Sequence, residues 1–228
     1  MIKILTLALP LFIGLISFKF SNYKLKKELK SNSSPLSDPL LVTIVNRLFR
    51  QLNLNEFKIL VYDSSSINGL AAPDGSILLT KGFINAYYQG RVTAEEIASV
   101  VAHELGHVAL NHHSRRVIDF GMQSTIRYTF GFLLSRFVPV LGNYILEIFM
   151  KTISAKLSRS DEYAADKYAA ALLIKTGIGV EPMITLFKKL DHLTGASNPK
   201  IAWLTSHPKS IDRIKNISQL NKNWSNEN

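Results

Sequence analysis

Apolar and polar stretches alternate along this chain with periods that predict its elements. The first apolar stretch, residues 4–18, carries no charge and lies between Lys3 and Lys19. As a helix it spans about 22 Å, and snorkelling of the flanking lysines could extend it towards the roughly 30 Å of a bilayer core. We therefore predict a membrane segment over residues 1–20, either an uncleaved anchor or a signal peptide. No small-x-small cleavage site precedes Lys19, which favours the anchor.

Polar residues dominate residues 21–37 and predict a linker. Asp38 and Pro39 then have the pattern of a helix N-cap and first helical position, so an amphipathic helix is expected to about Leu52. A run rich in β-forming residues at 57–62 predicts a strand.

Two apolar runs within residues 67–80 flank a Pro-Asp-Gly turn signal and predict a hairpin. Residues 81–89 predict a short helix. A longer helix should follow, because Thr93 and Glu96 have the spacing of a capping box. Its apolar stripe consists of Ile97, Val101, Leu105 and Val108.

The stretch from Arg115 to Ser160 allows two interpretations. Its longest charge-free piece, residues 137–146, is too short to span a bilayer. It predicts either a pair of core helices broken around Pro139 and Gly142, or a hairpin that dips into the membrane surface. The Asn-, Ser- and Lys-rich residues 221–228 predict a disordered tail.

Composition narrows the class of protein. The 228 residues carry a net charge of +10 and contain no cysteine, which excludes disulfides, cysteine-bound zinc and thiol catalysis. The densest run of lysines directly follows the apolar N-terminal segment, a placement that suits anionic lipid headgroups better than a DNA-reading face. We predict membrane lipids and no nucleic acid as partners, and one folded domain over residues 38–220.

The capped helix contains an HExxH motif, from His103 to His107. Residues four apart lie on the same face of a helix, so the two histidines can hold one ion. Imidazole nitrogens suit zinc, and Glu104 can act on the same ion's water as a general base.

A third ligand is offered by Glu162, in helix-forming residues that should end before Gly177. Asp166 lies four residues further on the same face and can fix the tautomer of a ligating imidazole. Two histidines, one carboxylate and a water form the open site of a catalytic zinc. Taken without the HExxH motif, Glu162 and Asp166 have an alternative interpretation as an ordinary pair of solvated carboxylates on a surface helix.

Three motifs together resemble the zinc endopeptidases that include the CAAX prenyl protease and the heat-shock protease HtpX. They are HExxH, the segment S-R-x-x-E-x-x-A-D that begins at Ser158, and the segment H-P-x-x-x-x-R-I that begins at His207. The resemblance implies an α+β, mainly helical, zincin-like metalloprotease domain with a small β-sheet or hairpin beside the HExxH helix. It also implies one zinc ion per chain, with a catalytic base and three ligands: Glu104, His103, His107 and Glu162.

The resemblance assigns further roles. His207 is expected near the metal, either stabilising the transition state or capping zinc as a removable fourth ligand, with Arg213 as its ion-pairing support. One stretch resembles the family's Asn-Ala-x-Ala strand, and as an edge strand it would bind an extended substrate through its main chain. It consists of Asn68, Gly69, Leu70 and Ala71. The chain has at most one membrane segment, so it is similar to compact members of the family rather than to multi-spanning ones.

We therefore predict a zinc-dependent metalloendopeptidase for protein quality control. Glu104 would take a proton from the attacking water and pass it to the leaving amine. Substrates are expected to be unfolded or membrane-associated proteins, and the enzyme is expected to be membrane-associated in a cell envelope, on a side that the sequence leaves open.

Two other functions are compatible with the sequence. A membrane-attached chaperone or binding module would keep zinc in a closed, non-catalytic site, with His207 as a permanent fourth ligand. A basic lipid- or nucleic-acid-binding protein would hold no metal and bind in a salt-sensitive way.

Overall fold

The structure of the chain is a computed structural model. It describes residues 20, 23–24, 27–54, 58–72, 74–112, 115, 141–193, 207 and 210–226. Residues 1–19 of the predicted membrane segment lie outside this set, as do most residues between 113 and 140. Within the described part of the chain, no helix combines the length and the apolar character needed to cross a membrane.

The chain divides into two compact units. The core unit comprises Glu28–Leu110 and Glu162–Asn228, and it contains every residue predicted for the site. The second unit comprises Met1–Lys27 and Asn111–Asp161.

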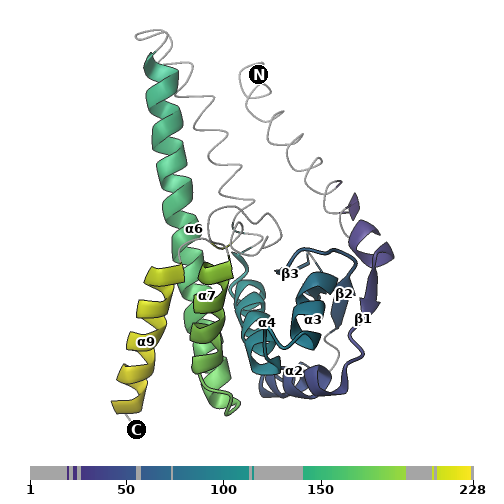
Figure 1. The fold of residues 1–228 in the computed structure, drawn as a ribbon. Coiled ribbons are helices and arrows are strands. Elements are labelled where there is room, and N and C mark those ends of the chain that lie inside the picture. The colour runs from purple at the N-terminus through teal and green to yellow at the C-terminus, as the bar shows by residue number, and fades with distance from the viewer. Residues whose placement is uncertain are drawn as a thin grey trace. The chain divides into compact units, whose positions relative to one another are not determined.

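A four-stranded sheet in the core unit has the order β1-β2-β4-β3 (Figure 1). The central strands β2 and β4 are parallel, and each pairs with its outer neighbour in antiparallel fashion. β3 is therefore one edge of the sheet and β1 the other. The strands are β1 (Ser33–Pro35), β2 (Ile59–Tyr62), β3 (Gly69–Ala71) and β4 (Ile77–Thr80).

The predicted hairpin is confirmed by the pairing of β3 with β4, in which Gly69 lies opposite Leu79. Gly75 closes the turn: its N–H donates to the carbonyl oxygen of Ala72 at 2.9 Å, and its φ of 85° is a left-handed value that glycine adopts without strain. The predicted linker is corrected at residues 33–35. They form β1 because β2 would otherwise expose an unpaired edge, and proline is tolerated in such an outer strand.

Six helices of at least eight residues lie among the described residues. They are α2 (Pro39–Gln51), α3 (Lys81–Tyr88), α4 (Ala94–Ala109), α6 (Leu141–Lys175), α7 (Glu181–Leu193) and α9 (Ser210–Asn226). α2 starts as predicted, since the Asp38 carboxylate accepts a hydrogen bond from the Leu41 N–H at 2.9 Å. α6 ends as predicted before Gly177, whose φ is 72°.

The predicted disordered tail is corrected by α9, which continues to Asn226. Its apolar residues recur at helical spacing, and Ile214, Ile217 and Trp224 all pack against the hydrophobic core. This apolar face keeps the polar C-terminal turns helical, because burial of one face supplies most of a helix's stability.

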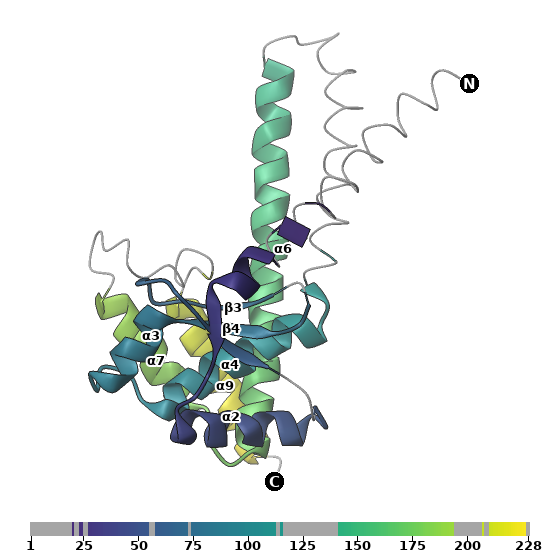
Figure 2. The same ribbon diagram turned by 90° about the vertical axis from the view of Figure 1, so that its right-hand side faces the viewer.

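α4 lies at the centre of the core unit, between the sheet with α3 on one side and α7 on the other (Figure 1). α2 packs against α4 and lies at the lower end of the unit in both views (Figure 2). Gly106 allows α4 to approach α6 closely, since a Cβ there would lie 2.9 Å from the carbonyl oxygen of Ala165. This contact places the predicted ligands of α4 and α6 side by side.

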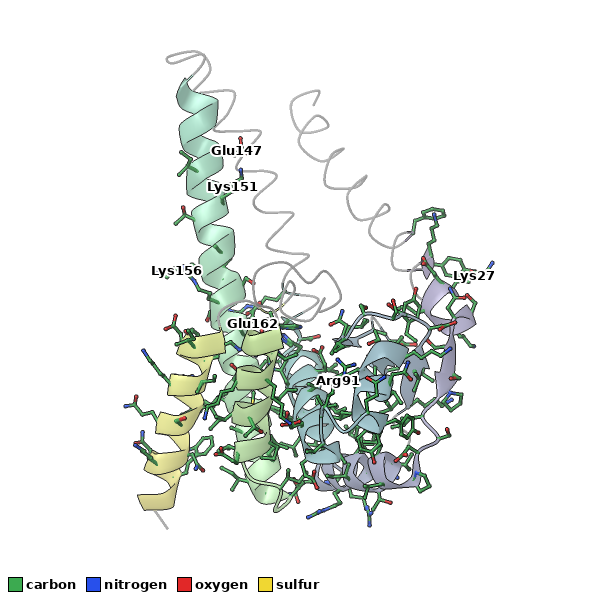
Figure 3. All side chains as sticks on the ribbon, viewed as in Figure 1. Lys27, Arg91, Glu147, Lys151, Lys156 and Glu162 are labelled. Carbon is green, nitrogen blue, oxygen red and sulfur yellow. The ribbon has the colours of Figure 1, made fainter. Side chains whose placement is uncertain are left out.

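The second unit contains the first turns of α6, from Leu141 to Asp161. On this part of the helix Glu147 and Lys151 form an exposed ion pair at 3.0 Å (Figure 3). Asp161 lies 3.7 Å from His112, and both side chains are buried. Within the predicted helix break or membrane-dipping hairpin, residues 137–140 fall outside the described residues, whereas Gly142, one of the two predicted break positions, lies inside α6.

Candidate metal centre

α4 presents the HExxH residues inside the core. The predicted capping box is confirmed: Thr93 Oγ1 accepts from the Glu96 N–H at 3.2 Å, and Glu96 Oε2 accepts from the Thr93 N–H at 2.9 Å. Lys189 of α7 reaches the same Glu96 carboxylate at 2.7 Å. The start of α4 is thus held by its own capping box and by Lys189 of α7. His103 and His107 lie further along the helix, and both side chains are buried.

Four buried side chains converge at one point of the core unit. They are His103, His107, Glu162 (labelled in Figure 3) and His207, and one ligand atom from each lies within 4.8 Å of all the others. His103 Nε2 is 3.1 Å from His107 Nε2 and 3.3 Å from His207 Nδ1. Glu162 lies 3.4 Å from each histidine of α4, and His207 Nδ1 lies 2.7 Å from Glu162 Oε2.

These separations fit a tetrahedral zinc ion. With metal–ligand bonds of about 2.0–2.1 Å, neighbouring ligand atoms of a tetrahedron are about 3.3–3.4 Å apart. Only the contact between His207 and Glu162 is clearly shorter. Two imidazole nitrogens and a carboxylate are also the donor set of many catalytic zinc sites.

The charges of the buried groups also fit a divalent cation. Glu104, Glu162 and Asp166 are buried carboxylates, and Arg213 is the buried cation that contacts two of them. With neutral histidines, this group has two negative charges in excess. Uncompensated charge is costly in a protein interior, and one divalent cation would neutralise it.

Asp166 supports His103 from behind the cluster. Asp166 Oδ1 lies 2.9 Å from His103 Nδ1, the ring nitrogen that points away from the other ligands. Such a contact places the proton on Nδ1 and leaves the Nε2 lone pair for a metal. Arg213 holds the same carboxylate with a two-pronged contact, Nε to Oδ2 at 2.7 Å and Nη2 to Oδ1 at 2.6 Å.

The pKa values of the metal-free cluster respond to these contacts. Burial lowers the pKa of His103, but hydrogen bonds to Asp166 and Glu162 outweigh it and raise that pKa to about 9. Burial raises the pKa of Asp166, but the contacts with Arg213 and His103 lower it by a larger amount, so the net shift is downward. Burial lowers the pKa of His207. A bound cation would reverse the shift at His103, because a ligating imidazole must give up its proton.

Glu104 faces both the cluster and the sheet. Its Oε2 accepts a hydrogen bond from the backbone N–H of Ala71 at 2.9 Å. Its Oε1 has no hydrogen-bond partner among the described residues and lies 3.4 Å from His207 Nε2. The carboxylate is therefore fixed at one oxygen, while the other oxygen points towards the cluster.

β3 brings the predicted substrate-binding stretch beside this carboxylate. The carbonyl oxygen of Asn68 and the N–H of Ala72 bond towards β4, at 3.0 and 2.8 Å. Because backbone groups alternate in direction along a strand, Gly69 and Ala71 turn theirs to the outer edge. The N–H of Ala71 meets Glu104 there.

Two features of the site were not predicted from the sequence. Phe187 of α7 stacks on the Arg213 guanidinium, with 4.5 Å from Cζ to the ring centroid. Arg213 contacts Asp166 with its side chain and His207 through the backbone carbonyl oxygen, at 3.3 Å, whereas support of the His207 side chain was expected. No local pattern marks the contacts of Arg213 with Phe187 and Asp166, because they join residues of different helices.

The family model described as Peptidase family M48 matches residues 35–221. The metalloprotease LoiP of Escherichia coli (strain K12) is 28% identical over 186 residues, which cover 78% of this chain and 68% of that protein. The metalloprotease YcaL of the same organism is 29% identical over 181 residues, covering 78% and 67%.

A third relative is a putative beta-barrel assembly-enhancing protease of Vibrio cholerae. It is 30% identical over 200 residues, which cover 82% of this chain but only 40% of that longer protein. The similarity to all three relatives extends over most of the chain.

Proposed function

Because the chain belongs to peptidase family M48 and is a metalloendopeptidase, we propose that zinc is its metal and that Glu104 is its catalytic base. His103, His107 and Glu162 would hold the ion. The observation that carries this proposal is the convergence of their ligand atoms beside a buried carboxylate that has one oxygen directed at the cluster.

The side chains divide the catalytic work. His103, His107 and Glu162 would hold a zinc ion, which would supply Lewis acidity for the scissile carbonyl and lower the pKa of a water molecule. Glu104 Oε1 takes the proton of the attacking water, while the Ala71 N–H holds the other oxygen in place. Glu104 then delivers that proton to the amine that leaves when the peptide bond breaks. Asp166 keeps His103 in the tautomer that binds metal.

His207 is best explained as a removable fourth ligand. Its Nδ1 lies within the cluster and its Nε2 lies 3.4 Å from Glu104 Oε1, so the ring occupies the place where water must enter. A zinc site with four protein ligands has no position left for water. Hydrolysis then requires the ring to withdraw, after which it can stabilise the transition state from nearby.

An extended substrate would bind along β3. The outer edge of β3 adjoins the Glu104 carboxylate, and a strand added there pairs through main-chain groups that are common to all sequences. Such recognition suits unfolded or membrane-associated proteins. One relative carries the name of a beta-barrel assembly-enhancing protease, which supports substrates at a membrane.

The proposed organisation places the catalytic domain at residues 38–220, extended by β1 and by α9. Residues 1–20 would attach it to a membrane of the cell envelope, as an anchor or signal segment, and the lysine-rich residues that follow would meet anionic lipid. A single such segment would suit compact members of the family better than multi-spanning members such as the CAAX prenyl protease and HtpX.

The test compares wild type with Glu104→Gln, using casein as an unfolded substrate. We expect cleavage to fall by about 10³-fold or more while zinc stoichiometry is unchanged, because the base is lost and the ligands remain. Glu95→Gln is the matched control: Glu95 is an exposed glutamate in the first turn of the same helix, and its replacement should leave cleavage intact. Full activity of Glu104→Gln would exclude the proposed role.

A second candidate function is a chaperone or binding module with a permanently closed zinc site. The position of His207 inside the cluster favours it over a metal-free protein. It predicts zinc in the purified protein, no chelator-sensitive cleavage of casein, and no gain of cleavage in His207→Ala. Gain of cleavage in that variant would instead favour the removable ligand.

A further inference from the structure

β3 packs against α4, and two contacts join them at matching spacing. Gly69 of β3 faces Val100 of α4, and the Ala71 N–H donates to the Glu104 carboxylate at 2.9 Å. Two residues advance a strand by about 6.6–6.8 Å, and four residues advance a helix by about 6.0 Å. The contact between Gly69 and Val100 therefore lies one step before the hydrogen bond to Glu104 along both elements.

Gly69 has no room for a side chain. A Cβ at this position would lie 2.5 Å from Cγ1 of Val100 and 3.6 Å from Cδ2 of Leu79, whereas carbon atoms in contact are about 3.5–4.0 Å apart. Gly69 pairs with Leu79 in the regular ladder of β3 and β4, so close approach rather than an unusual backbone conformation requires glycine here. A methyl group of Val100 thus lies directly against the backbone of β3.

Val100 cannot easily make room for a larger residue. A β-branched side chain in a helix has one strongly preferred rotamer, and Val100 is only 2% exposed in the hydrophobic core. β3 is an edge of the sheet, so it can shift more easily than the central helix α4. A methyl group on residue 69 would therefore move β3 away from α4 by about 1 Å. A shift of that size is enough to break the 2.9 Å hydrogen bond between Ala71 and Glu104.

We propose that Val100 is a positioning residue for Glu104, acting through its contact with Gly69. The contact sets the separation of α4 and β3 at which the Ala71 N–H reaches one oxygen of the Glu104 carboxylate and leaves the other directed at the metal cluster. This role rests on the proposed function, because it affects catalysis only if Glu104 is the base. It also gives a physical reason for glycine at the first alanine position of the Asn-Ala-x-Ala pattern, since alanine would fit only opposite a residue smaller than Val100.

The test measures kcat and KM of the zinc-loaded full chain with a fluorogenic peptide that contains a casein cleavage site. We expect Gly69→Ala to lower kcat by about 10-fold or more, because Glu104 loses the hydrogen bond that orients its carboxylate. KM should change by less than about 3-fold, since an extended substrate pairs with the edge of β3 and shifts with it. Val100→Ala removes methyl groups from the opposite side of the contact. Combined with Gly69→Ala, it should restore kcat to within about 3-fold of wild type.

Two further measurements identify the hydrogen bond as the route. In an Ala71→Pro background, which lacks this N–H, Gly69→Ala should not lower kcat further. Amide hydrogen exchange, followed by NMR, reports on the same bond without catalysis. We expect the Ala71 N–H to exchange about 10-fold faster or more in Gly69→Ala, and to recover its wild-type rate when Val100→Ala is added.

Val45→Ile is the matched control. It also adds one methyl group to the same hydrophobic core, but from α2, which packs against α4. We expect lower thermal stability with unchanged kcat and unchanged exchange of the Ala71 N–H. If Gly69→Ala is too unstable to purify, Val100→Ile enlarges the same contact from the α4 side and should give the same changes with smaller amplitude.

Two results would overturn this role: wild-type kcat and exchange in folded Gly69→Ala, or a loss of kcat that Val100→Ala does not rescue. The experiment also separates this role from the proposed function. Faster exchange in Gly69→Ala that Val100→Ala reverses, together with full cleavage by Glu104→Gln, contradicts the proposed function alone. Cleavage that is lost in Glu104→Gln but unaffected by Gly69→Ala contradicts the role of Val100 alone.

Discussion

His103 and Glu104 are neighbours on α4, but the protein supports them in opposite ways. Behind His103 stand a buried carboxylate, a buried guanidinium and an aromatic ring, contributed by α6, α9 and α7. Behind Glu104 stands one backbone N–H, from Ala71 of β3.

The difference follows from what each side chain must do. A metal ligand needs one fixed tautomer and direction, so a charged network that leaves no freedom is useful despite its desolvation cost. A base must accept a proton and release it again. A single hydrogen bond to a neutral donor orients the carboxylate and leaves its second oxygen available.

Asp166→Asn breaks the support of His103 and should have the largest effect. Arg213 would lose its two-pronged ion pair and keep the 3.4 Å contact with Glu162, and breaking a buried ion pair typically costs about 3–5 kcal/mol of folding stability. Metal affinity should fall by about 10- to 100-fold, because the tautomer of His103 is no longer fixed. Denaturant unfolding and chelator competition measure the two effects.

The control for this change is Asp212→Asn. Asp212 is the exposed neighbour of Arg213 on α9, and its replacement should alter stability by less than about 0.5 kcal/mol. Equal effects of the two variants would show that the buried network has no special role.

Removal of the metal should lower the stability of the fold, because the buried carboxylates of the site lose the cation that neutralises them. At a metal concentration of 100 times Kd, a bound ion stabilises the fold by about 2.7 kcal/mol. Thermal unfolding with and without a chelator measures this change. Glu104→Gln should lose less on chelation than wild type, because it removes one of the buried carboxylates that repel each other in the metal-free protein. An equal loss of stability in the two proteins would show that the charge of Glu104 does not interact with the other buried carboxylates of the site.

Ala71→Pro breaks the support of Glu104 instead. The hydrogen bond from an N–H to a charged group contributes about 1.5–3 kcal/mol, so kcat should fall by about 10- to 100-fold. Metal affinity should be unchanged. The strand should tolerate proline, because this N–H points away from β4. Ala71→Gly is the control, because it keeps the N–H and should retain kcat. A loss of metal binding in Ala71→Pro would show that the support of Glu104 is not separate from the support of His103.

The sequence predicted the parts of this comparison that are local. The capping box from Thr93 to Glu96, the HExxH pair and the β3–β4 hairpin each depend on residues only a few positions apart, and all three lie where they were expected. The first strand and the last helical turns were missed, because β1 depends on pairing with β2 and the end of α9 on packing against the core.

The supports of the site are not local. Asp166 and Arg213 are separated by 47 positions, and Ala71 and Glu104 by 33. A motif identifies Asp166 and Arg213 as candidates, but only the packing of α6, α7 and α9 decides that they bind each other. The Ala71 contact involves a backbone N–H, which leaves no trace in the residue type.

Phe187→Leu tests how far the support of His103 extends, and should have the smallest effect. A cation–π contact contributes about 0.5–2 kcal/mol, so the Arg213 fork should loosen and metal affinity should fall a few-fold. Phe83→Leu is the matched control, since Phe83 is equally buried in the same core but belongs to α3. Both changes remove similar apolar volume and should cost similar stability, so chelator competition isolates the contribution of the stacked ring. Identical metal affinities of Phe187→Leu and Phe83→Leu would show that Phe187 does not contribute to the support of His103.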